Sequence, residues 1–202
     1  MNYNLYNRIV EAVENKKITK TELQSLINEV REESRGIWEE APEGESKIIS
    51  IDSSSTITGW ALYENGHLKD SGIINLKKEK DSVIRCETMV MEIFELLKKY
   101  SPNTIVVENN VGGRNAKTER MLGHIVGTIE GWSLANFAEF VLLSPSEWRK
   151  AVKPAAGPSC PKKREEAKQW SINRVSELFG KAVNDDEADA ILLGYALCLK
   201  RS

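Results

Sequence analysis

The 202-residue sequence predicts an α/β domain in which a mixed five-stranded sheet carries helices on both faces. Short runs rich in β-branched residues, bounded by turn residues, indicate the strands, and longer segments with apolar residues at helical spacing indicate the helices. The first three strand-like runs are joined by turns too short for a helix, which favours antiparallel pairing. The later strand-like runs alternate with helical segments, which is typical of parallel pairing.

The elements follow in order from residue 47. Three strands come first, at residues 47–53, 58–64 and 67–76, and Asn65-Gly66 is a strong hairpin signal between the last two. A helix follows, whose predicted apolar face carries Val83, Val90, Ile93, Phe94 and Leu97. The remaining segments are a strand at 103–108, a helix through Met121 and Ile129, a strand at 139–143, a basic segment, and two closing helices.

A second unit is predicted before this domain. In residues 1–38, two stretches of apolar residues at helical spacing predict a helical hairpin, and Thr19 and Glu22 have the spacing of a capping box. Residues 39–46 are a polar linker, and the main domain spans 47–202. Residues 1–46 hold six Lys/Arg and ten Asp/Glu, a balance that favours a brace or partner-binding element over a DNA-binding helix.

Composition sets limits on the class of protein. With 41% hydrophobic and 29% charged residues, the chain is long enough for one well-buried core. No apolar run approaches the length of a membrane span, so we expect a cytoplasmic protein. Cys86, Cys160 and Cys198 form no CxxC pair and have only two histidines to join them, which predicts reduced thiols and no zinc site.

The distribution of charge is more informative than the net charge of −2. Residues 145–168 contain seven basic residues and three acidic ones. A positive surface beside carboxylates is what a nuclease needs, because it holds the phosphates of its substrate. A solvated loop and helix face would have the same composition, so the charge alone leaves both interpretations open.

Four carboxylates occupy positions that suit a metal site. Asp52 and Glu108 each follow a short apolar strand, and acids at such exits are costly to bury unless a cation neutralises them. Asp186 and Asp189 lie three residues apart at the start of the last helix, so both project from one side of its first turn. Each feature alone is also explained by exposure to solvent or by helix capping.

The order of these motifs resembles the RuvC-like Holliday-junction resolvases. Residues 51–61 resemble the first strand and turn of that family, where an aspartate is followed by small residues and a Thr-Gly pair. Val106-Val107-Glu108 resembles the second acidic motif, and residues 112–127 resemble the loop and helix after it. Asp186-Glu187-Ala188-Asp189-Ala190 matches the final Asp-x-x-Asp-Ala helix, so the resemblance covers about residues 47–199.

The resemblance implies a ribonuclease H-like core, a homodimer and an endodeoxyribonuclease that cuts four-way junctions and leaves 5′-phosphates. It also implies two Mg²⁺ ions, for which Mn²⁺ can substitute, with Asp52 shared between them, Glu108 on one, and Asp186 and Asp189 on the other. Such a small resolvase would suit a bacterial virus or prophage, acting in DNA recombination and repair.

The same resemblance implies that Lys163 contacts a phosphate and acts on the transition state, with Lys162 as the alternative in register. Together with the basic stretch, it gives the residues expected to contact DNA: Arg114, Asn115, Lys117, Arg120, Trp148, Arg149, Lys150, Lys162, Lys163 and Arg164. Val111 lies where the family presents a bulky aromatic, so the sequence preference of cutting stays open.

Other functions are also compatible with the sequence. A nuclease of the same fold could act on flaps, forks or RNA–DNA hybrids with the same carboxylates, and a branched-DNA-binding protein could retain them without catalysis. Residues 51–56 also resemble the first phosphate loop of actin-like sugar and acetate kinases. Those kinases need a second, duplicated domain and a Gly-rich adenosine site, for which this chain is too short.

Overall fold

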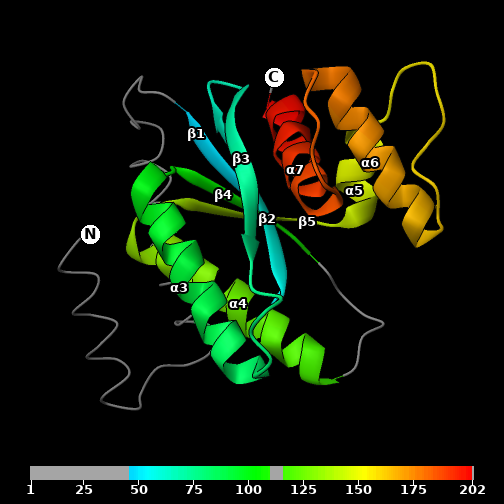
Figure 1. Cartoon of the computed structure of the whole chain (residues 1–202). Coiled ribbons are helices and arrows are strands. Elements are labelled where there is room, and N and C mark those ends of the chain that lie inside the picture. Colours follow the sequence, from blue (N-terminus) through cyan, green and yellow to red (C-terminus); the bar gives the residue numbers. More distant parts are fainter. Residues whose placement is uncertain (1–45, 110–115, 202) are drawn as a thin grey trace, which may run out of the picture. The chain divides into compact units, whose positions relative to one another are not determined.

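The computed structural model describes residues 46–109 and 116–201, which belong to one compact unit. Its centre is a five-stranded sheet with the strand order β3-β2-β1-β4-β5 (Figure 1). The strands are β1 (Lys47–Asp52), β2 (Ile57–Glu64), β3 (His67–Asn75), β4 (Thr104–Glu108) and β5 (Glu139–Leu143). β2 runs antiparallel to both β1 and β3, whereas β1, β4 and β5 are parallel. The predicted mixed sheet is therefore confirmed.

Helices cover both faces of this sheet (Figure 1). On one face lie α3 (Ser82–Tyr100) and α4 (Ala116–Ala135). On the other lie α5 (Pro145–Ala151), α6 (Arg164–Phe179) and α7 (Asp185–Arg201). The predicted N-terminal hairpin at 1–38 and its linker to residue 45 lie outside the described residues and stay predictions.

Local sequence explains where these elements begin and end. Asn65 and Gly66 both have positive φ, 51° and 77°, as the predicted hairpin turn requires. Asp81 caps α3 by accepting hydrogen bonds from the backbone N–H groups of Val83 and Ile84. Ser144 and Glu147 form a capping box at α5, a short helix inside the basic segment that the sequence analysis did not predict.

Two hydrophobic clusters hold the layers together. In β1, Ile49 and Ile51 face α3 and α4, while Ile48 on the other face joins the cluster beneath α7. The predicted face of α3 is partly wrong: Val83 is 62% exposed, and the buried residues are Cys86, Met89, Ile93 and Leu97. Among the described residues, no helix has the length and apolar character needed to cross a membrane.

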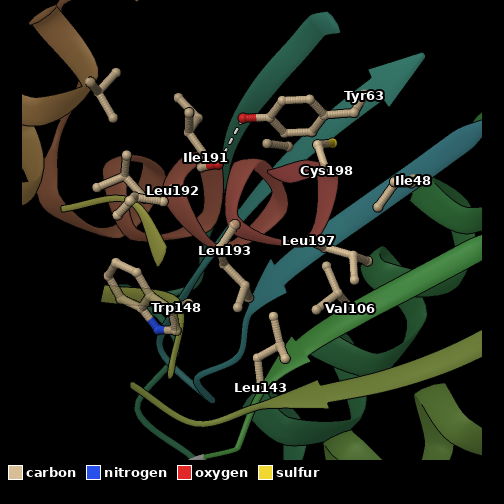
Figure 2. Packing of buried hydrophobic residues seen from close by; sticks show 14 of the residues in the cluster. Ile48, Tyr63, Val106, Leu143, Trp148, Ile191, Leu192, Leu193, Leu197 and Cys198 are labelled. Carbon is tan, nitrogen blue, oxygen red and sulfur yellow. Dashed lines mark hydrogen bonds between the residues drawn. The ribbon is translucent and has the colours of Figure 1, made fainter. Parts of the chain in front are cut away.

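The position of α7 is set by direct contacts with β1 and β2. The buried Ser50 hydroxyl donates to the Ala190 carbonyl at 2.7 Å, and the Tyr63 hydroxyl donates to the Ile191 carbonyl at 2.7 Å. Figure 2 shows Tyr63 reaching α7 from one side, and Leu193 and Leu197 facing the strands on the other. Because both hydroxyls bond carbonyls of the helix backbone, they fix the depth and rotation of α7.

A glycine permits this close approach at the start of α7. A Cβ atom added to Gly59 would lie 1.9 Å from the Asp186 carbonyl oxygen, so no larger residue fits unless the helix moves. The start of α7 therefore lies directly on β2, beside the end of β1.

We predict that Gly59→Ala destabilises the fold by about 1 to 3 kcal/mol, because the added methyl group forces the first turn of α7 away from the sheet. The matched control is Gly131→Ala in α4, where a Cβ meets nothing within 4 Å. That change should leave stability unchanged or raise it by about 0.5 to 1 kcal/mol. Thermal and denaturant unfolding measure both, and equal stability of the two variants would contradict the close packing.

Candidate active site

The ends of two parallel strands bring Asp52 and Glu108 to the same edge of the sheet. Ile51 pairs with Val107, and the two acids are the next and last residues of β1 and β4. The first turn of α7 adds Asp186 and Asp189 from the layer above. All four predicted carboxylates line one pocket of about 880 Å³, together with Asp185. The structure thus brings together residues that are up to 137 positions apart in sequence (189 − 52).

Trp148 holds Glu108 in place. Its indole Nε1 donates a hydrogen bond of 2.6 Å to Glu108 Oε2, and both residues are buried, Trp148 with 0% exposure. The prediction that Trp148 contacts DNA is therefore wrong, since a fully buried ring offers no face for a base to stack on. Figure 2 shows this side chain packed below α7. The hydrogen bond holds the Glu108 carboxylate in one orientation.

The surroundings of Asp189 disfavour its negative charge, which a nearby cation would stabilise. Burial raises the pKa of Asp189 to about 6, and the charges of Glu108 and Asp185 add to this, while Ser171 and Arg149 oppose it. The Arg149 guanidinium is 3.9 Å from Asp189 Oδ2, a long ion pair. Within the described residues, the buried Oδ1 atom of Asp189 and the buried Ser171 hydroxyl both lack a partner of normal hydrogen-bond geometry, although Ser171 is near enough to lower the pKa of Asp189. One oxygen of this carboxylate is therefore available to a ligand.

The neighbouring acids of α7 differ from each other. Burial and the charge of Asp185 raise the pKa of Asp186. Burial is the largest single influence on Asp185 and acts to raise its pKa, but the hydrogen bond from Lys168, a backbone hydrogen bond and the charges of Lys168 and Lys77 together outweigh it, and the net shift is downward. The hydrogen bond between Lys168 and Asp185 also raises the pKa of Lys168. Asp185 is therefore ionised and paired with Lys168 of α6. The raised pKa of Asp186 shows that its negative charge is less well compensated.

The donor set fits divalent cations that prefer oxygen. Its ligands are carboxylates, which suit Mg²⁺, Ca²⁺ or Mn²⁺, and one of them keeps an unpartnered buried oxygen. In residues 46–109 and 116–201, however, no three Asp, Glu, His or Cys side chains lie close enough together to hold an ion as they stand. Glu108, Asp189 and Asp185 are turned instead toward Trp148, Arg149 and Lys168. Metal binding therefore requires side-chain rotation.

Basic side chains share the pocket with these acids. Six of its lining residues are cationic: Arg149, Lys150, Lys153, Lys162, Arg164 and Lys168. Four of them, Arg149, Lys150, Lys162 and Arg164, are among the predicted DNA contacts. The basic stretch is thus more than a solvated face, because it borders the carboxylates directly.

Three other predicted contacts lie elsewhere. Lys163 does not line the pocket; its side chain is 82% exposed and pairs with Glu166 at 3.1 Å, so the alternative register at Lys162 fits the pocket better. Lys117 lines a second, smaller pocket, and Arg120 is exposed and lines neither of these two pockets. Arg114, Asn115 and Val111 lie outside the described residues.

Several lining residues were not singled out by the sequence. Asp185 is adjacent to the predicted Asp186, but nothing in the motif distinguishes it, and Lys168 becomes its partner only through the packing of α6 on α7. Cys160, predicted as a structural thiol, lines the pocket, and burial raises its pKa. The basic stretch around Trp148 gives no sign of its hydrogen bond to Glu108, because the two residues are 40 positions apart in sequence.

Comparison with solved structures identifies the fold. The RuvC of T. thermophilus, solved with a Holliday junction substrate, superposes with a TM-score of 0.60 at 14% sequence identity, covering 77% of this chain and 94% of that one. The Fowlpox virus resolvase, solved with Holliday junction DNA, gives 0.51 at 16% identity over 77% of this chain and 98% of that one. Both likenesses confirm the predicted ribonuclease H-like fold.

Sequence comparison gives the family. A crossover junction endodeoxyribonuclease RuvC from Chlorobium phaeobacteroides is 24% identical over 155 residues, 75% of this chain and 79% of the relative. The family model described as "Crossover junction endodeoxyribonuclease RuvC" matches residues 48–198, which include all four predicted carboxylates. This chain therefore belongs to the RuvC family of crossover junction endodeoxyribonucleases.

Proposed function

We propose that this protein is a structure-selective endodeoxyribonuclease that resolves four-way (Holliday) junctions. One observation carries the proposal: the family's acidic residues, Asp52, Glu108, Asp186 and Asp189, line a single pocket that cationic side chains border. Carboxylates can hold the metal for phosphodiester hydrolysis, and the cations can hold the phosphates on either side. Two alternatives are a nuclease that acts on flaps, forks or hybrids and a non-catalytic junction-binding protein. The assay described below distinguishes them.

The cofactor proposed for this site is Mg²⁺, with two ions per active site. Asp52 would be shared between the ions, Glu108 would complete one site, and Asp186 with Asp189 would complete the other. When bound, the cations supply charge that polarises the phosphodiester and favours attack by water. The unpartnered Oδ1 of Asp189 and the raised pKa of Asp186 support this assignment, since both indicate acids that lack positive charge.

The protein's own residues have separate tasks in the proposed reaction. Trp148 keeps Glu108 oriented through its indole N–H. Lys150, Lys162 and Arg164 would hold phosphates, and the charge of one of them near the scissile group would favour the transition state. Arg149 would move from Asp189 to DNA when metal binds, because its ion pair is already long.

We also propose that the active form is a homodimer that works on DNA in the cytoplasm. A four-way junction has two-fold symmetry, and a two-fold symmetric enzyme would place one active site on each of two opposed strands. The resulting paired nicks would leave 5′-phosphates. The N-terminal segment, residues 1–38, would serve as a brace between subunits or as a partner-binding element, in line with its acidic balance.

The direct test compares an immobile four-way junction with linear duplex, flap and RNA–DNA hybrid of matched sequence. We expect paired nicks confined to the junction, dependent on Mg²⁺, lost in EDTA and reduced by about three orders of magnitude or more in Asp52→Asn, since loss of a shared ligand disturbs both ions. Junction binding without cutting in any metal would establish a non-catalytic protein, and preferential cutting of flap or hybrid would replace the substrate.

We predict that Trp148→Phe lowers junction cleavage by about ten- to a hundred-fold and raises the Mg²⁺ concentration for half-maximal activity, because Glu108 loses the indole N–H that holds it. Trp132→Phe is the matched control, since Trp132 packs on the opposite face of the sheet, away from the pocket. Metal titrations of cleavage measure the effect. An unchanged metal dependence for Trp148→Phe would contradict an orienting role.

In the metal-free protein, the ionised Asp189 carboxylate should lower the stability of the fold. A carboxyl whose folded pKa is raised binds protons more tightly when folded, so its cost to the fold grows between its ordinary pKa of 3.8 and about pH 6 and stays constant above that. Asp189→Asn should therefore unfold at a higher temperature than the native protein in EDTA at neutral pH, and the difference should shrink as the pH falls from about 6 to below 3.8. A pH-independent difference would contradict the raised pKa.

A further inference from the structure

A second pocket lies beside the candidate active site. It has a volume of about 320 Å³ and is formed by the turn after β1, the start of α3 and the start of α4. Its polar lining comprises the hydroxyl residues Ser54, Ser55, Thr56 and Thr118 and the cations Arg85 and Lys117, among others. Among the residues that the structure describes, no carboxylate lines it, in contrast to the five in the larger pocket. Its chemistry suits an anion that accepts several hydrogen bonds.

The Arg85 guanidinium is already fixed in position. Its Nε donates to the Ser55 carbonyl at 3.0 Å, and its Nη1 donates to the Glu79 carbonyl at 2.9 Å. The side chain is half-buried and so has little freedom left to lose on binding. These two bonds could serve only to hold the turn after β1 against α3. That structural role does not explain why α4 brings a second cation, Lys117, to the same pocket.

Asp81 offsets only part of the positive charge of this pocket. Asp81 is close enough to Arg85 and Lys117 to feel their charges, but its Oδ1 already accepts the backbone N–H groups of Val83 and Ile84, at 2.8 and 3.1 Å. Those backbone bonds are the main reason that the pKa of Asp81 is lowered. One ionised carboxylate thus faces two cations, so the pocket keeps net positive charge for a ligand.

The two pockets share residues of one wall. Ser54 and Thr118 line both, and Ser54 is two residues from Asp52 at the end of β1. We propose that the second pocket is a phosphate subsite, in which Arg85, Lys117 and the turn hydroxyls bind a backbone phosphate of the cleaved DNA strand, a few nucleotides from the scissile phosphate. This inference rests on the proposed function and adds a site that fixes the register of the strand over the carboxylates.

The test replaces single phosphates near the cut site of a junction by neutral methylphosphonates and measures affinity in the full-length Asp52→Asn background, where DNA stays intact. In this background, a neutral linkage at one position should weaken binding. Arg85→Gln and Lys117→Gln should each lose sensitivity at that same position and make the salt dependence of log affinity shallower by about 0.7 to 0.9. Lys98→Gln, an exposed lysine at the far end of α3, should retain the full pattern.

The outcomes separate the two proposals. Unchanged position sensitivity in Arg85→Gln and Lys117→Gln, with normal junction cutting by the protein that retains Asp52, would overturn the subsite alone. A change in Lys117→Gln only would also overturn it, since Lys117 would then be a surface contact. A protein that neither binds nor cuts junctions would overturn both.

Thermal stabilisation by inorganic phosphate without any change in the DNA pattern would assign the pocket to free phosphate and overturn the strand subsite. Unfolding temperatures confirm that each variant is folded.

Discussion

The contact between α7 and the antiparallel half of the sheet is the constraint on which the rest of this structure depends. Ser50 and Tyr63 bond the carbonyls of Ala190 and Ile191, and Gly59 lets the backbone of Asp186 lie against β2. These contacts join strands near the start of the domain to its last helix. They decide how far Asp186 and Asp189 lie from Asp52, so a packing interaction in the core sets the geometry of the polar site.

Gathering acids at one edge of a sheet has an electrostatic cost, and the surrounding residues limit it in different ways. Trp148 binds Glu108 through a neutral donor, Lys168 pairs fully with Asp185, and Arg149 reaches Asp189 only at 3.9 Å. Glu108 and Asp185 are thus well supported, while Asp189 and Asp186 keep raised pKa values. The pocket combines firmly held acids with acids that gain most from a cation, which is the behaviour expected of a metal-dependent nuclease.

Much of the fold and the acidic residues could be predicted because they depend on local pattern. Short β-rich and apolar runs bounded by turn residues predict the strands within one or two residues, and Asp52, Glu108, Asp186 and Asp189 stand at their ends or at a helix start. The misplaced features depend on tertiary packing. Trp148 lies in a basic stretch that is typical of the surface, but packing in the hydrophobic cluster beside α7 buries it, and its indole bonds a residue 40 positions away. Whether Lys162 or Lys163 faces the pocket depends on where α6 begins, at Arg164.

The most direct measurement is a crystal structure of the protein grown with Mn²⁺, with anomalous diffraction data collected at the manganese edge. We expect manganese between Asp52 and Glu108 and between Asp52 and the Asp186–Asp189 pair, with Arg149 moved away from Asp189. Manganese bound elsewhere, or none at these carboxylates at millimolar Mn²⁺, would contradict the claim that the four acids form a metal centre.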